Sequence, residues 1–304
     1  MIKPADEPDL IISEALTKES RRQEKGTGKN SLEMIEIELL LEGIRRRWGY
    51  DFTHYSMASV KRRLEHAKRE AGFTHFTQLL DRLLHDETFF DRFLRHMSIT
   101  VTEMFRDPSF YQAVREKLIP VLKTFPFVKI WHAGCATGEE VYSMAILLHE
   151  EDFLGRARLY ATDFNKHSLD SAEKGVYSLA NMEHYAANYR ASGGKRDFSS
   201  YYSSGYGLAK IKDFLRERIT FSYHNLATDG VFGEMNLISC RNVLIYFDKT
   251  LQDRVFTLFT DSLRYGGYLC LGSKETINFS NMKKLYDPIE GKQKIYKKCG
   301  AIHV

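Results

Sequence analysis

A strand, a glycine-containing turn and a helix follow one another without interruption over residues 128–143. The apolar run at 128–133 is typical of a buried parallel strand. Small residues fill positions 134–138, and an amphipathic helical pattern then begins. This order predicts the first half of a nucleotide-type α/β fold, in which a ligand lies beyond the carboxyl end of the strand and against the helix N-terminus. Gly134 and Gly138 would let the backbone turn tightly and approach that ligand closely.

Two adjacent carboxylates, Glu139 and Glu140, begin the predicted helix. They would repel a pyrophosphate, although negative charge suits the positive end of a helix. A ligand with ammonium and hydroxyl groups fits better, and S-adenosylmethionine carries both together with a sulfonium. This stretch alone leaves two interpretations open: a cofactor site, or two glutamates that only favour the start of the helix.

The chain has 304 residues, enough to bury a sizeable core and to form two domains. Its formal net charge of +4 is modest, so electrostatic recognition has to rest on local charge. No apolar run approaches the roughly 18–20 residues of a transmembrane helix, and the N-terminus is acidic and polar, unlike a signal peptide. The four cysteines lie far apart without a CxxC pair, which argues against zinc and disulfides and for a reducing cytoplasm. We therefore expect a cytoplasmic protein without a metal centre.

The first part of the chain predicts a flexible polar tail at 1–29 and a small all-α domain at 30–97. Asn30 followed by Glu33 forms a capping-box pattern at the start of its first helix. The other three helices are expected at about 57–71, 73–85 and 86–97. All four are short and amphipathic, so they have to bury their apolar faces against one another.

The helix expected at 57–71 is basic on one side, with Lys61, Arg62, Lys68 and Arg69 on two neighbouring columns of the helical wheel. Glu65 lies between them and can form ion pairs within the helix. One interpretation is a solvated face with internal ion pairs, which contribute little stability. The other is a docking surface for an acidic partner. Nucleic acid is disfavoured, because the basic residues are not interleaved with aromatic residues.

Residues 98–127 predict a linker and a helix, begun by Pro108, that lead into a core domain at 128–304. The helix at 249–265 should be closed by Gly266 and Gly267. An inserted antiparallel β subdomain is predicted at about 190–218, where Tyr, Ser and Gly are frequent. Further core strands are expected at Ala157–Thr162, Ile219–Tyr223, Met235–Cys240, Tyr268–Leu271 and Gln293–Lys298, the last two as an antiparallel pair.

Polar residues follow four successive core strands: Glu139, Asp163, Asn225 and the pair Arg241-Asn242. An open α/β sheet builds its site in this way, because the carboxyl ends of its strands meet at one edge. Asp163 is placed to accept hydrogen bonds from ribose hydroxyls. It could also cap the helix expected at 165–175, and we favour the ribose interpretation because a glycine turn precedes it.

Several stretches resemble the chemotaxis-receptor glutamate O-methyltransferases, the CheR-type enzymes. The stretches are Thr-Val-Thr-Glu-Met-Phe-Arg-Asp at 100–107, Ala-Thr-Gly-Glu-Glu at 136–140 with Tyr142-Ser143, Ala-Thr-Asp at 161–163, and Cys-Arg-Asn-Val-Leu-Ile-Tyr-Phe-Asp at 240–248. The last is the most specific. The resemblance covers about residue 30 to the end, with Thr100 and Val141 as departures where the family often has Asn and Pro.

The resemblance implies a class I methyltransferase fold, with a mostly parallel seven-stranded sheet, that binds S-adenosylmethionine and releases S-adenosylhomocysteine. It implies that glutamates on the cytoplasmic domain of a transmembrane chemoreceptor are methylated, with the basic helix (Lys61, Arg62, Lys68 and Arg69) at the docking surface. We expect a monomer that binds no nucleic acid and does not insert into a membrane. By motif, the catalytic residues would be Arg106, Arg241 and Tyr246, and the cofactor site would comprise Thr100, Thr102, Arg106, Gly134, Glu139, Asp163, Asn225, Leu226, Arg241 and Asn242.

Other functions remain open at this point. A methyltransferase for small molecules or nucleic acids is disfavoured by the stretch at 240–248 and by the lack of an Asn/Asp-Pro-Pro-Tyr motif. A signalling adaptor with an inactive methyltransferase fold is disfavoured by intact Glu139, Asp163, Arg241 and Tyr246. A nucleic-acid-binding module that uses the basic helix would have to show salt-sensitive, unspecific binding to duplexes.

Overall fold

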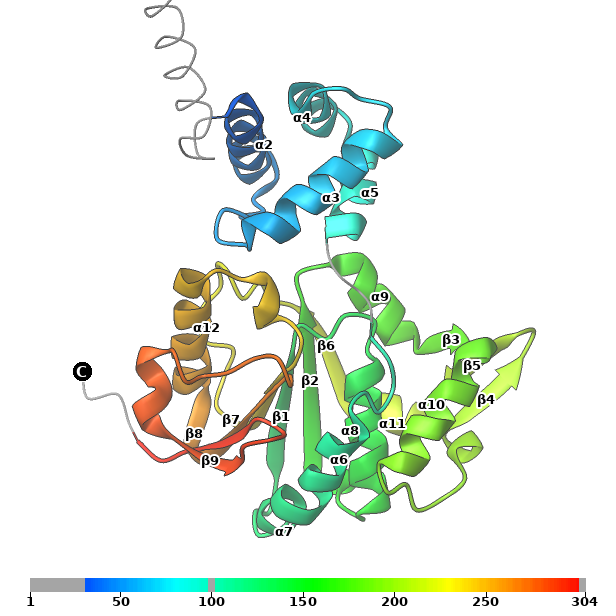
Figure 1. Ribbon diagram of the computed structural model, residues 1–304. Helices are drawn as coiled ribbons and strands as arrows, with labels where there is room; N and C mark the ends of the chain where they lie inside the picture. Colours follow the sequence, from blue (N-terminus) through cyan, green and yellow to red (C-terminus); the bar gives the residue numbers. More distant parts are fainter. Residues whose placement is uncertain (1–30, 98–101, 301–304) are drawn as a thin grey trace, which may run out of the picture. The chain divides into compact units, whose positions relative to one another are not determined.

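Figure 1 shows the computed structural model of the protein, which describes residues 31–97 and 102–300. By their contacts these residues form two compact units, one of 31–53 with 64–86 and one of 54–63 with 87–300. Helix α3 (Met57–Glu70) contributes to both units. The predicted domain boundary at residue 97 stays a prediction. No helix within the described residues is long and apolar enough to cross a membrane.

The first unit consists of α2 (Leu32–Trp48), α4 (Phe76–His85) and the second half of α3. The Trp48 indole N–H donates to the Leu83 carbonyl oxygen (2.9 Å), and the Phe76 amide donates to the Glu36 carboxylate (3.0 Å). Helix α2 is capped by the Ser31 side chain, which accepts from the Met34 amide. The predicted cap is therefore wrong by one residue, and Asn30 itself lies outside the described residues.

The apolar stripe expected on helix α3 comprises Val60, Leu64, Ala67 and Ala71. The first three are buried, whereas Ala71 lies beyond the end of α3 and is half-buried. The basic residues of α3 differ in their surroundings. The Lys68 ammonium lies 4.1 Å from the centroid of the Phe76 ring, whereas Arg62 and Arg69 are exposed. In the second unit, α5 (Glu87–Met97) buries Phe90, Phe93, Leu94 and Met97.

The second unit contains the predicted seven-stranded sheet, in the order β6-β2-β1-β7-β8-β10-β9. The first five strands are parallel, and β10 is antiparallel to both of its neighbours. This arrangement confirms the predicted fold class. The strands are β1 (Val128–Ala133), β2 (Ala157–Asp163), β6 (Ile219–Tyr223), β7 (Met235–Cys240), β8 (Leu263–Leu271), β9 (Tyr286–Glu290) and β10 (Ile295–Lys298).

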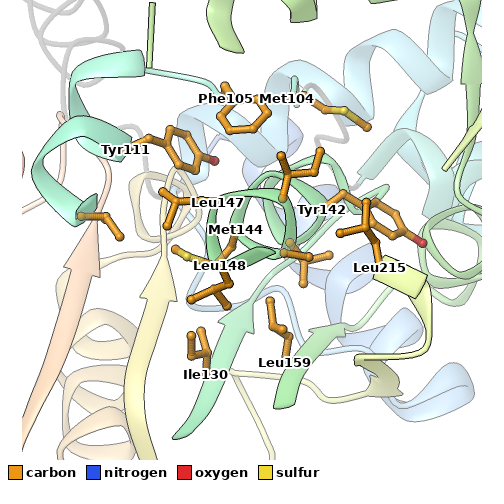
Figure 2. Close-up of a cluster of buried hydrophobic side chains, with 14 of the residues drawn as sticks. Met104, Phe105, Tyr111, Ile130, Tyr142, Met144, Leu147, Leu148, Leu159 and Leu215 are labelled. Atoms are coloured by element: carbon orange, nitrogen blue, oxygen red, sulfur yellow. The ribbon is translucent and has the colours of Figure 1, made fainter. Parts of the chain in front are cut away.

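Adjacent residues of β1 face opposite sides of the sheet, as the two-residue period of a strand requires. Ile130 packs in the hydrophobic cluster that surrounds α8 (Glu139–Glu150), whereas the Trp131 ring contacts Phe259 of α12 (Lys249–Ser262) with ring centroids 5.5 Å apart. Figure 2 shows α8 between β1 and β2 on one side and Met104, Phe105 and Tyr111 of the linker on the other. Helix α8 is therefore buried along most of its length.

The linker joins this core through α6 (Pro108–Ala113), a π-helical turn (Val114–Leu118) and α7 (Ile119–Leu122). Pro108 occupies the first turn, as predicted. The Phe105 amide donates to the Ser143 hydroxyl (2.9 Å), which fixes the linker to α8.

The remaining helix that follows a core strand is α9 (Lys166–Lys174), after β2. The short helical segments of this unit are η2 (Leu154–Arg156), η3 (Phe198–Tyr201), α11 (Asp213–Arg216), η4 (Leu244–Tyr246) and η5 (Asn281–Leu285).

The inserted subdomain is a three-stranded antiparallel sheet in the order β3-β5-β4 (Figure 1). Strands β4 (Tyr202–Gly205) and β5 (Leu208–Ile211) lie in the predicted range. Strand β3 (Val176–Ser178) precedes α10 (Leu179–Ala191), so the subdomain begins earlier than predicted. A strand of three residues is too short to show an alternating pattern.

The C-terminal part differs from the sequence analysis in two features. Helix α12 ends at Ser262, and β8 begins at Leu263 and continues through Gly266 and Gly267. A Cβ atom at Gly267 would lie 3.0 Å from the Arg264 oxygen and 3.1 Å from the Asn236 oxygen, so this glycine permits close backbone approach instead of ending a helix. Strand β9 was not predicted, and its Pro288 is tolerated because β9 is an edge strand.

Candidate active site

A cavity lies where four parallel strands end. Its wall contains Gly134 after β1, Asp163 at the end of β2, Asn225 after β6 and Arg241 after β7. The structure therefore brings together predicted residues that are up to about a hundred positions apart in the chain. Thr102, Arg106, Leu226, Asn242 and Tyr246 line the same cavity, and Thr100 lies outside the described residues.

The turn after β1 has the tight backbone that its glycines predict. Gly134 and Gly138 have φ angles of 76° and 92°, in the region that favours glycine. The amides of Gly134 and Cys135 both donate to the Thr162 carbonyl oxygen, at 2.8 and 2.9 Å. A Cβ atom at Gly134 would lie 2.6 Å from the Val243 side chain, so this position has no room for a larger residue.

Asp163 supports this turn and lines the cavity. One carboxylate oxygen accepts from the Ala136 amide and the other from the Asn165 amide, both at 2.9 Å. Burial raises the pKa of Asp163, against the lowering effect of these backbone donors. The N-cap of α9 is Asn165, which accepts from the His167 and Ser168 amides. The alternative interpretation of Asp163 as the helix cap is therefore wrong.

The structure separates the two glutamates at the start of α8. Glu140 lines the cavity, whereas Glu139 does not and instead accepts from the Thr137 hydroxyl (2.6 Å). Burial raises the pKa of Glu139, against hydrogen bonds from Thr137 and Tyr185. The assignment of Glu139 to the cofactor stays a prediction, and Glu140 is the glutamate of this pair that the cavity wall contains. Consecutive helical residues point about 100° apart, so the two glutamates have different surroundings.

Glu140 is held as an anion by three donors. One oxygen accepts from Ser239 (2.6 Å) and lies 3.0 Å from His132 Nδ1, and the other accepts from Arg241 (3.1 Å). Burial alone would raise the pKa of Glu140, but the His132 hydrogen bond, the Arg241 charge and the Ser239 hydrogen bond lower it to about 2. A fixed negative charge therefore lies in the cavity wall at neutral pH.

Arg241 bridges two carboxylates from different elements. Its guanidinium donates to Glu140 and to Asp107 (2.7 Å), and its Cζ lies 4.0 Å from the centroid of the Phe110 ring. Burial alone would lower the pKa of Arg241, but Glu140 and Asp107 raise it, so the guanidinium stays charged. The side chain is only 1% exposed. Arg241 therefore fixes the linker against the start of α8.

Sequence reasoning missed Asp107, His132 and Ser239. His132 and Ser239 lie on adjacent parallel strands in register, β1 and β7, so their pairing on Glu140 follows from sheet geometry. A signal was present in the sequence, because polar residues in otherwise apolar strands require partners. Asp107 offered no such signal, since its position before Pro108 also suits a helix start.

Comparisons with known proteins agree with this geometry. Residues 100–295 match the family model described as CheR methyltransferase, SAM binding domain, and residues 35–98 match the CheR methyltransferase, all-alpha domain. Cher3 of Pseudomonas putida is 51% identical over 264 residues, which cover 87% of this chain and 97% of that protein. The chemotaxis protein methyltransferase of Listeria innocua is 30% identical over 236 residues (77% and 87%), and that of Salmonella typhimurium 28% over 262 residues (84% and 88%).

The cavity residues fit S-adenosylmethionine, the cofactor of this domain. The carboxylates of Glu140 and Asp163 suit an ammonium group and hydroxyl groups. Within the described part of the chain, His132 Nε2, His224 Nδ1 and Arg241 Nε are buried without a hydrogen-bond partner, and all three residues line the cavity. Buried polar atoms usually have partners, so these atoms are consistent with a polar ligand.

The low pKa of Glu140 predicts a specific pH dependence of stability. The folded-state pKa of Glu140 lies below the ordinary 4.5. The ionised side chain therefore contributes its full stabilisation of the fold above pH 4.5, and this contribution is lost as the pH falls toward about 2. A shift of this size corresponds to about 3 kcal/mol. Urea denaturation at successive pH values should show that Glu140→Gln removes this part of the acid-induced loss. The control is Glu183→Gln, at an exposed position, and its free energy of unfolding should depend on pH as that of the wild type does. The same pH dependence in all three proteins would contradict the prediction.

Proposed function

Because the chain belongs to the CheR methyltransferase family, we propose that this S-adenosylmethionine-dependent methyltransferase methylates glutamate side chains of chemoreceptors. The products would be glutamyl methyl esters on the cytoplasmic domain of the receptor. Similarity to proteins named chemotaxis protein methyltransferase supports this proposal. One feature of the cavity carries it: both carboxylates in its described wall are held by protein donors, and the same wall contains Arg63, Arg106 and Arg241.

This arrangement suits an acceptor that is already an anion. A glutamate side chain has an ordinary pKa of about 4.3, so it is ionised at neutral pH and needs no general base. Glu140 and Asp163 are engaged with donors and are poorly placed to remove a proton. The protein therefore has to orient the acceptor and exclude water. When bound, S-adenosylmethionine supplies the electrophilic methyl group.

Arg106 and Tyr246 are the residues that we assign to the acceptor. Both line the cavity, and the guanidinium of Arg63, from the same unit, lies 5.3 Å from the centroid of the Tyr246 ring. Positive charge at this point favours a carboxylate acceptor over a neutral one. We assign Arg241 a positioning role, because it is buried and bonded to Glu140 and Asp107.

The cofactor-binding residues follow from the cavity wall. Glu140 would face the ammonium end of S-adenosylmethionine, and Asp163 the ribose hydroxyls. Asn225 and Leu226 would border the adenine, since both line the cavity after β6. Thr102, Gly134 and Asn242 would complete the wall, and the role of Thr100 stays a prediction.

The exposed basic residues of α3 are the proposed docking surface for the acidic receptor helices. Arg62 and Arg69 are exposed and available for this role. Lys68 contributes less, because its ammonium contacts the Phe76 ring, and Lys61 is half-buried. The proposed docking surface therefore consists mainly of Arg62 and Arg69, two of the four residues that the sequence predicts.

Receptor-containing membranes and a methyl-labelled cofactor test the proposed function directly. We expect label on the receptor that mild base releases as methanol, as methyl esters require. Asp163→Ala should abolish labelling because it removes a cavity carboxylate and a support of the glycine turn. Asp170→Ala, an exposed aspartate of α9, is the matched control and should label normally. Base-stable label, or none with folded wild-type protein, would contradict the proposal.

Charge reversal tests the docking surface. The double variant Arg62→Glu with Arg69→Glu should raise KM for the receptor about tenfold at low salt, because attraction to the acidic partner becomes repulsion. The KM for S-adenosylmethionine should stay unchanged. Lys283→Glu with Lys284→Glu makes the same change in net charge at two exposed positions of η5 and should have little effect. If both double variants raise the KM for the receptor equally, the increase is due to net charge, and the proposed docking role of α3 is wrong.

A further inference from the structure

A second buried carboxylate, Glu275, lies behind the cavity wall and belongs to none of the sequence motifs. It follows β8 and is 4% exposed. One oxygen accepts from the amides of Val243 (2.8 Å) and Leu244 (2.7 Å). The other accepts from the amides of Asn242 (3.0 Å) and Gly272 (2.6 Å). Four backbone N–H groups therefore converge on one side chain.

This set of donors requires an ionised carboxylate. Each carboxylate oxygen accepts hydrogen bonds from two N–H groups. If the carboxyl group were protonated, its O–H would point at these N–H groups and could not form a hydrogen bond with them. Successive backbone N–H groups in such a turn form a concave anion site, and here the protein fills the site with its own side chain. Hydrogen bonds to a buried charge are among the strongest in proteins.

The backbone that Glu275 holds forms part of the cavity wall. Asn242 and Val243 line the cavity directly after Arg241. Asn242 has a φ angle of 63°, a left-handed conformation that residues other than glycine adopt rarely, although asparagine tolerates it better than most. Val243 fills the space beside Gly134, where a Cβ atom would approach it to 2.6 Å.

Gly272 shows how closely these segments approach each other. A Cβ atom at this position would lie 2.8 Å from both the Asn242 amide nitrogen and the Glu275 carboxylate. The loop after β8 is therefore in contact with the loop after β7, and the carboxylate transmits the position of one to the other.

We infer that Glu275 is a positioning residue of the cofactor site, which acts by fixing the backbone of residues 242–244 against the glycine turn. The inference rests on the proposed function only in that S-adenosylmethionine occupies this cavity. It predicts that loss of the Glu275 charge weakens cofactor binding in a protein that still folds.

Glu275→Gln tests the inference with little change in volume. The amide nitrogen that replaces one oxygen would face two N–H donors, so at least two hydrogen bonds are lost. We expect calorimetry to show S-adenosylhomocysteine binding weakened by about tenfold or more. In methyl transfer, the KM for S-adenosylmethionine should rise more than kcat falls. Both changes should appear well below the unfolding temperature of the variant.

Glu150→Gln is the matched control for loss of a buried carboxylate. Glu150 is 6% exposed and accepts from the Lys195 amide (2.9 Å), from the Tyr189 and Tyr201 hydroxyls and from Arg115. Glu150 is the last residue of α8 and does not line the cavity. Its replacement by Gln should lower the free energy of unfolding without changing the affinity for S-adenosylhomocysteine. Wild-type affinity in Glu275→Gln, or equal losses of affinity in both variants, would overturn the inference.

A second variant covers the case in which Glu275→Gln does not fold. Gly272→Ala leaves the charge in place and displaces the Asn242 backbone sterically, so it should weaken S-adenosylhomocysteine binding in the same way. Unchanged affinity in this variant would overturn the inference. Absence of receptor methylation together with these losses of affinity would refute the proposed function and leave the role of Glu275 intact.

Discussion

The buried ion-pair network around Arg241 is the interaction on which the site depends. A single guanidinium joins Asp107 of the linker to Glu140 at the start of α8, and it lies on the Phe110 ring. Removing Glu140 would leave the buried Arg241 guanidinium without its less exposed partner, a change that costs about 3–5 kcal/mol in buried pairs. The Asp107 side chain is 39% exposed, so its ion pair contributes less. The linker, the sheet and α8 are thereby fixed to one another at the cavity. Catalytic geometry and folding stability therefore share the same residues.

The network also sets the chemistry that the cavity can support. Its two carboxylates are engaged as hydrogen-bond acceptors, so they act as fixed charges. This suits transfer of a methyl group to a carboxylate, which is nucleophilic without losing a proton at neutral pH. Asn242 and Val243, whose amides donate to Glu275, form another part of the wall. The two carboxylates, Glu140 and Glu275, are thus preorganising elements on different loops.

Much of the fold could be predicted because its signals are local. Strands β1 and β7 have the predicted bounds, since buried parallel strands form continuous apolar runs between turns. The edge strand β6 also has the predicted bounds, because its sequence Ile-Thr-Phe-Ser-Tyr is rich in β-branched and aromatic residues. The bounds of α12 and β8 could not be predicted, because glycines that usually end helices here permit close strand pairing. The choice between Glu139 and Glu140 depends on helix rotation, which neighbouring carboxylates do not reveal. Glu275 was missed because its partners are backbone groups, which leave no pattern in a sequence.

The choice between these two glutamates is the most direct test of the account. Calorimetric titration with S-adenosylhomocysteine should be compared for wild type, Glu140→Gln and Glu139→Gln. Glu140 lines the cavity and Glu139 is bonded to Thr137 instead, so only Glu140→Gln should weaken binding, by about tenfold. Glu139→Gln should bind like the wild type. Weaker binding by Glu139→Gln with unchanged binding by Glu140→Gln would contradict the account.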